Sequence, residues 1–197
     1  MTGGDDRGRT LRIAVNLVAY QAAWFACVLG AARGINSLGV AAVVAALALH
    51  LALSRHRASD ALLIVATLAT GLVWEAALAQ TGLVEYAAHG PSALWALWAP
   101  AWILALWALF AAVLREPLRW LHGRPLLGAL LGGVGGALSY QGAARLGACN
   151  FADPVAALLV LGIGWAVITP LLIELARRLD PRPQTQPQPQ PQPVACS

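Results

Sequence analysis

The sequence predicts an all-α integral membrane protein, a bundle of about six transmembrane helices with both termini in the cytoplasm. Of the 197 residues, 59% are hydrophobic and only 11% are charged, against roughly 25% charged residues in an average soluble domain. The apolar residues fall into separate runs, each close to the ~20 residues that a helix needs to cross a bilayer. None of these runs shows the period-two alternation of a barrel strand, so helices are the spanning structure that fits.

Six apolar segments are expected to span the membrane, each bounded by Arg, Pro, Gly or Asp. They are residues 11–32, 35–53, 61–80, 94–114, 126–142 and 155–175. The second is short, and glycine makes the fifth weakly hydrophobic. Residues 1–10 then form a cytoplasmic N-terminal segment and residues 11–178 the transmembrane domain. Residues 179–197 form a disordered tail, because their repeated Pro and Gln cannot bury apolar area.

The Arg residues set the expected orientation, because all thirteen basic residues are Arg. If the N-terminus is cytoplasmic, eleven of them lie inside and only two, Arg33 and Arg145, lie outside. This bias fits the positive-inside rule and an even number of spans. The net charge of +4 therefore reflects topology, and nucleic acid is a poor candidate partner.

No metal or cofactor site is expected. The three cysteines, Cys27, Cys149 and Cys196, have neither paired nor metal-type spacing. The chain also lacks a nucleophile or nucleotide-binding motif.

Glycines repeat every four residues along the fifth segment, at Gly128, Gly132 and Gly136. One face of this helix therefore has almost no side chains, which lets a second helix approach closely. We expect this packing helix to be central in the bundle. The alternative, a hinge or broken helix beside a ligand site, is the weaker interpretation.

A polar and aromatic stripe follows the first segment, because Asn16, Tyr20, Trp24 and Cys27 fall within about 80° of one another at helical spacing. Such a stripe should face protein. Hydrogen bonds between helices explain it better than a cofactor site does.

Glu75, next to Trp74, is the most informative residue, because it lies inside the third segment. It is expected roughly 7 Å from the middle of that helix, toward the periplasmic side. An unpaired carboxylate there would cost a few kcal/mol. It must therefore be protonated, hydrated from a cavity, or paired.

Other polar residues are expected in the same half of the bilayer. The predicted periplasmic-side cluster comprises Glu75, Trp74, Arg145, Arg33, Tyr140, Gln141, Asp153 and His89. Two interpretations have about equal weight: a cavity that opens to the periplasm above Glu75, or a structural ion pair of Glu75 with one of the two Arg residues.

Several stretches resemble a known family: NLVAYQAAWFACVLGAARG (16–34), GLVWEAAL (71–78) and LRWLHGRPLLGALLGGVGGALSYQGAARLGA (118–148) among them. They are similar to the domain of unknown function 2878, a family of small bacterial inner-membrane proteins, and the resemblance covers residues 12–178. In that family the acidic position of the third helix is usually Asp, where this chain has Glu75. Members are often encoded beside enzymes that modify membrane fatty acids, which implies an accessory role in lipid modification.

Two classes of function follow. The first is a non-catalytic inner-membrane component that binds membrane lipids, another membrane protein or a lipid-modifying enzyme. The second is a small transporter or proton-linked permease that uses Glu75. A membrane-embedded enzyme ranks third, because it would need a second acid or base near Glu75, and only His89 or Asp153 is available.

Overall fold

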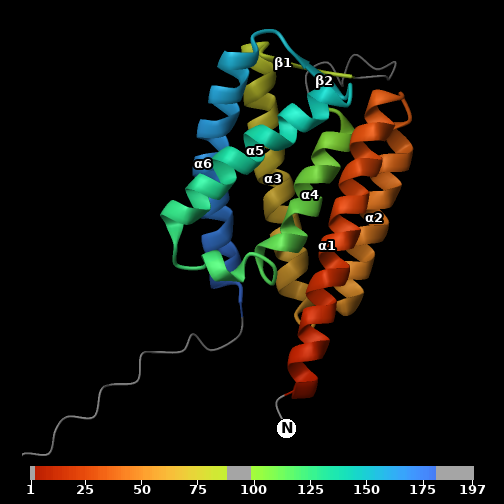
Figure 1. The fold of residues 1–197 in the computed structure, drawn as a ribbon, viewed down its shortest axis with the longest axis vertical. Helices are drawn as coiled ribbons and strands as arrows, with labels where there is room; N and C mark the ends of the chain where they lie inside the picture. The colour runs from red at the N-terminus through yellow and green to blue at the C-terminus, as the bar shows by residue number, and fades with distance from the viewer. Residues whose placement is uncertain (1–2, 88–98, 181–197) are drawn as a thin grey trace, which may run out of the picture.

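The structure, a computed structural model of the chain, describes residues 3–87 and 99–180. Six α-helices, a short 3-10 helix and two short strands lie in these residues (Figure 1). In chain order they are α1 (Gly3–Ala32), α2 (Asn36–Leu53), α3 (Arg57–Thr81), β1 (Val84–Tyr86), α4 (Ala101–Leu114), η2 (Arg119–Leu121), α5 (Pro125–Arg145), β2 (Cys149–Phe151) and α6 (Pro154–Arg178).

The helices pack as three antiparallel pairs, α1 with α2, α3 with α4, and α5 with α6 (Figure 1). The start of α1 and the end of α6 lie at one end of the bundle, together with the α2–α3 and α4–α5 connections. The two strands lie at the opposite end. The helix α5 crosses the bundle obliquely, from beside α6 at its start to near the end of α1.

Among the residues that the structure describes, four helices are long and apolar enough to cross a membrane, over Thr10–Ala32, Asn36–Leu53, Arg57–Thr81 and Pro154–Arg178. Their length and composition are consistent with a membrane protein. The helix α5 falls outside this group, because its glycines add little hydropathy.

The helix α4 is shorter than the expected segment 94–114, because it begins at Ala101 after an extended Pro100 (ψ 146°). Residues 94–98 lie outside the described residues. The 14 residues of α4 rise about 21 Å, less than the ~30 Å hydrocarbon core of a bilayer. We therefore expect α4 to cross only part of the bilayer over its described length.

The centre of the bundle is α4, where we had expected the glycine-rich helix. Nine of its 14 residues are buried, and Trp102 and Trp107 are the largest enclosed side chains. The helices α1, α2 and α3 all pack against it. By contrast, α5 leaves its leucines exposed, Leu126 to 84%, because a helix with one glycine face can pack closely on one side only.

The glycine face of α5 packs against α6. A Cβ added to Gly132 would lie 2.2 Å from Thr169 Oγ1 and 2.6 Å from the Trp165 carbonyl oxygen, and one added to Gly136 would lie 2.2 Å from Trp165 Cγ. Gly128 lies against α6 less tightly, 3.4 Å from Ile173 Cδ1. The two backbones therefore approach as closely as glycine permits.

Two glycines of α5 give a matched test of this packing. Gly132→Ala should lower the free energy of unfolding by about 1–3 kcal/mol, because the added methyl overlaps α6. Gly135→Ala, one turn away with no atom within 4 Å of the new Cβ, should leave stability unchanged or raise it by up to about 1 kcal/mol through helix propensity. Unfolding in mixed detergent micelles measures both, and equal losses would contradict the close approach.

A small antiparallel sheet is added to the all-α fold that we expected. The strand β1 pairs with β2 in the register Val84↔Phe151, Glu85↔Asn150 and Tyr86↔Cys149. Its pairing ties the segment after α3 to the segment before α6. This sheet holds Tyr86 beside the last turns of α3.

Candidate functional site

Glu75 lies in the interior of the bundle, with none of its surface exposed. Its Oε1 accepts hydrogen bonds from Trp107 Nε1 of α4 (2.8 Å) and from the Tyr140 hydroxyl of α5 (2.5 Å). Its Oε2 accepts one from the Tyr86 hydroxyl of β1. Three elements besides α3 therefore each supply one neutral donor to the carboxyl group.

The local sequence explains this geometry. Gly71 lies one turn before Glu75 on α3, and a Cβ there would meet Trp107 Cγ at 2.2 Å. The missing side chain lets the indole of Trp107 lie flat against α3, with its Nε1 at the carboxyl group. Tyr86 is held by the sheet and by an edge-to-face contact with Trp102 at 5.7 Å between ring centroids.

The donor role of Tyr86 agrees with its ionisation. Burial raises the pKa of the Tyr86 hydroxyl well above its usual value, and the neighbouring Tyr140 and Glu75 raise it further. The hydroxyl is therefore protonated at physiological pH. It donates a hydrogen bond to Glu75.

Two members of the predicted periplasmic-side cluster meet, namely Glu75 and Tyr140. Trp74 points elsewhere, because a Cβ at Gly164 of α6 would lie 1.9 Å from Trp74 Cη2. The two adjacent residues thus face different helices. Trp74 packs α3 against α6, and Glu75 faces α4 and α5.

The other predicted members lie away from this group. Arg33 and Arg145 are exposed at helix ends, and Gln141 is half-buried. Asp153 caps α6, accepting hydrogen bonds from the backbone N–H groups of residues 155 and 156 at 2.9 and 3.1 Å. His89 lies outside the described residues. The structure therefore surrounds Glu75 with aromatic donors in place of the Arg partner that we considered.

Sequence reasoning missed Trp107 and Tyr86 as partners of Glu75. A signal was present for Trp107, because an indole N–H inside an apolar helix needs an acceptor. No signal pointed to Tyr86, because its position depends on pairing between strands more than sixty residues apart.

A second buried polar group lies near the end of the bundle where α1 begins and α6 ends. Arg115 Nη1, directly after α4, lies 2.5 Å from Asp60 Oδ1 of α3, and His50 Nε2 of α2 lies 3.7 Å from Asp60 Oδ2. The Ser54 hydroxyl also donates to Asp60. Asp60 and Arg115 are 5% and 4% exposed, so this is a desolvated ion pair. From the sequence alone, Arg115 is one of the eleven Arg residues expected on the cytoplasmic side, and no partner was predicted for it.

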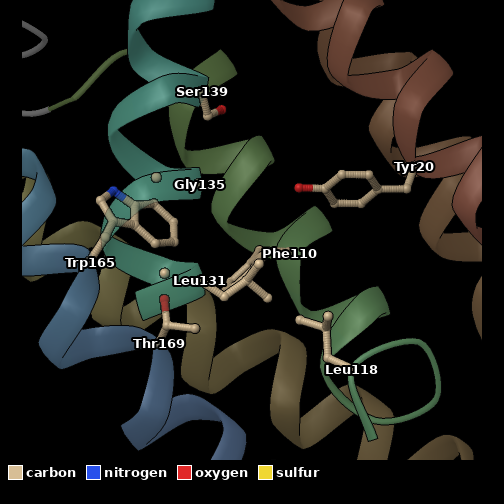
Figure 2. A pocket seen from close by; sticks show the side chains of 10 residues that line it. Tyr20, Phe110, Leu118, Leu131, Gly135, Ser139, Trp165 and Thr169 are labelled. Atoms are coloured by element: carbon tan, nitrogen blue, oxygen red, sulfur yellow. The ribbon is translucent and has the colours of Figure 1, made fainter. Parts of the chain in front are cut away.

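A groove of about 220 Å³ lies between α1, α4, α5 and α6 (Figure 2). The residues that characterise it are Tyr20, Phe110, Gly135, Ser139, Trp165 and Thr169. A hollow of about 50 Å³ adjoins it and shares Tyr20, Phe110, Ser139 and Trp165. None of the residues that line either space is charged.

The groove exists because α1 and α5 touch near one end of the bundle and then diverge. They meet where Trp24 Nε1 donates to Ser139 Oγ at 3.2 Å and where Gly142 lies against the Trp24 ring. Toward the other end the oblique course of α5 separates the helices (Figure 1). Gly135 is exposed there, and no atom lies within 4 Å of a Cβ added to it. The groove therefore opens sideways between the two helices.

The stripe on the first helix contributes one wall of this groove. Tyr20 and Trp24 are half-buried, and Asn16 and Cys27 are buried. Figure 2 shows the Tyr20 hydroxyl pointing from α1 across the groove toward α5. The stripe thus faces protein and, at Tyr20, the groove.

The sequence model of the family described as protein of unknown function (DUF2878) matches residues 13–171. The chain belongs to this family. No curated protein and no solved structure matches it. The matched region includes Glu75, its three donors and the whole groove.

In this DUF2878 chain a single layer of side chains separates the smaller hollow beside the groove from the buried carboxyl group. Trp107 and Tyr140 line the smaller hollow, and both donate to Glu75. Trp107 also stacks on Trp165, with ring centroids 4.6 Å apart and planes 12° apart, and Phe110 meets Trp165 edge-on at 5.3 Å. Glu75 therefore fixes the aromatic wall of the groove.

The described part of the chain holds no group of three or more His, Cys, Asp or Glu residues placed to bind a metal ion. What the site offers is an apolar, aromatic recess with a few neutral hydroxyl and indole donors. Such a recess suits binding of a neutral apolar group.

Proposed function

We propose that this protein is a non-catalytic component of the bacterial inner membrane that binds the apolar part of a membrane amphiphile between α1 and α5. One observation carries the proposal: the uncharged groove opens sideways at the mid-height of the candidate spans. Tyr20 is adjacent to the middle residue of the span Thr10–Ala32, and Trp165 to that of Pro154–Arg178. The opening therefore faces hydrocarbon.

The chemistry of the walls supports an apolar occupant. The apolar side chains of Phe110, Leu131 and Trp165 line the groove, together with glycines of α5. A cavity of ~150 Å³ lined by apolar side chains binds benzene, so the larger groove has room for a segment of a lipid chain or a small ring.

The orientation that we propose places both termini and the Arg-rich connections in the cytoplasm. Arg55 lies between α2 and α3, Arg57 begins α3, and Arg119 and Arg124 lie between α4 and α5. Both connections lie at the end of the bundle where α1 begins and α6 ends (Figure 1), which suits the positive-inside rule. With the neighbourhood that the family resemblance implies, this supports an accessory role beside a lipid-modifying enzyme.

Filling the groove tests the binding proposal. Gly135→Phe should lower the amount of amphiphile that copurifies with the protein by about tenfold or more, which corresponds to roughly 1.4 kcal/mol of binding free energy. Gly135→Ala is the matched control, because its methyl group has space and leaves the groove open. Mass spectrometry of the extracted lipids measures both variants. Equal retention by both would contradict binding in this groove.

The alternative, a proton-linked permease, draws support from one observation, a carboxyl group that a single residue separates from the hollow beside the groove. Proteoliposomes with an imposed pH gradient distinguish the two functions. A permease would carry protons in the wild type and lose this flux in Glu75→Gln. The binding function predicts no flux in either protein.

A further inference from the structure

We infer that the group held in the groove is a neutral ring bearing carbonyl oxygens, the headgroup of a prenylated benzoquinone, with its tail passing between α1 and α5 into the lipid. This inference rests on the proposed function and specifies its ligand. Three features of the groove point to it: the shape of the space, the donors in its walls, and the lack of charge.

The shape and walls suit a ring. The volume of about 220 Å³ exceeds the ~150 Å³ that accommodates benzene, which leaves room for ring substituents. Phe110 and Trp165 form one side, and Tyr20 faces them from α1 (Figure 2). Aromatic rings attract one another in stacked and edge-to-face arrangements. A flexible acyl chain gains nothing from this arrangement beyond contact area.

The hydroxyl groups in the walls need acceptors that the protein does not supply. The Ser139 hydroxyl accepts from Trp24, which leaves its own O–H free to donate. The Thr169 hydroxyl and the Trp165 indole Nε1 also have no hydrogen-bond partner within residues 3–87 and 99–180, but neither atom has surface open to the groove, so they are not donors to an occupant. A polar group that an occupant covers is normally paired, so an occupant with carbonyl oxygens fits beside Ser139 where a plain hydrocarbon chain does not.

The hydroxyls of Tyr20 and Ser139 are the donors best placed for such an occupant. In Figure 2 they extend into the groove from opposite walls, Tyr20 from α1 and Ser139 from α5. Because no charged residue lines the groove, a phosphate or carboxylate headgroup would lack a counter-charge there. A quinone is neutral and carries its oxygens on the ring.

Equilibrium binding to the full-length protein in nanodiscs tests the inference, with empty nanodiscs as the blank. The probes are a radiolabelled benzoquinone with a decyl tail and a radiolabelled palmitate. The double variant Tyr20→Phe, Ser139→Ala should weaken saturable quinone binding by about tenfold, from the loss of hydrogen bonds, and leave palmitate binding unchanged. Gly135→Phe should remove quinone binding altogether.

Each result separates this inference from the proposed function. Palmitate binding that depends on Gly135, without saturable quinone binding, overturns the inference and leaves the function intact. A hydroxylated fatty acid that binds more tightly than the quinone, and whose binding also depends on Tyr20 and Ser139, overturns the inference that the bound headgroup is a ring. Binding of none of these probes contradicts both. If the double variant unfolds at a lower temperature than the parent, Tyr20→Phe alone supplies the comparison, and unchanged quinone affinity then overturns the inference.

Discussion

Glu75→Leu is expected to lower the free energy of unfolding by roughly 3 kcal/mol or more. The substitution leaves the hydroxyls of Tyr86 and Tyr140 and the indole of Trp107 without their acceptor in the interior of the bundle, and each unsatisfied group costs about 1–3 kcal/mol. Reversible unfolding in mixed micelles with increasing SDS measures the loss.

The control for this prediction is Glu85→Leu, which replaces an exposed carboxylate on β1 and should change stability by no more than about 0.5 kcal/mol. A double-mutant cycle isolates the hydrogen bond itself: in a Tyr140→Phe background, Glu75→Leu should cost less, because one donor is already gone. Parental stability of Glu75→Leu would show that the carboxyl group does not organise these donors.

Asp60→Ala should destabilise the protein by about 3–5 kcal/mol, because it leaves the charge of Arg115 buried and uncompensated. Replacing both residues, as Asp60→Leu with Arg115→Leu, should recover most of this loss, since a buried ion pair often contributes no more than apolar side chains of similar volume. The same unfolding measurement applies.

Glu174→Ala is the matched comparison for the ion pair, because Glu174 pairs with Arg177 at i,i+3 and Arg178 at i,i+4, and 36%, 34% and 73% of these side chains are exposed. Breaking these exposed pairs should cost less than about 1 kcal/mol. If Asp60→Ala were as mild as Glu174→Ala, the pair between α3 and α4 would be solvated, contrary to the packing described above.

The sequence predicted the helices well, because a bilayer requires long apolar runs. The expected segments 35–53 and 155–175 lie almost entirely within α2 and α6. The sequence did not predict features whose position depends on contacts between segments far apart in the chain. The strands of three residues were too short to recognise, and the central place of α4 reflects burial by three neighbours.

The site shows the same division. Because Glu75 is isolated in an apolar helix, the sequence was enough to predict that its carboxyl group is protonated, hydrated or paired. The hydrogen-bond partners of Glu75 could not be predicted. Charge alone favoured Arg33 and Arg145, whereas the aromatic donors come from α4, α5 and a strand. The groove was also unforeseen, since it arises from the oblique course of α5 (Figure 1).

Photo-crosslinking with a lipid that carries a diazirine at mid-chain tests most directly whether a membrane amphiphile occupies the space between α1 and α5. The proposal predicts adducts on Tyr20 and Leu131, mapped by mass spectrometry, which Gly135→Phe abolishes and Gly135→Ala preserves. Adducts confined to the exposed Leu126 and Leu138, outside the groove, and equally abundant in both variants would contradict it.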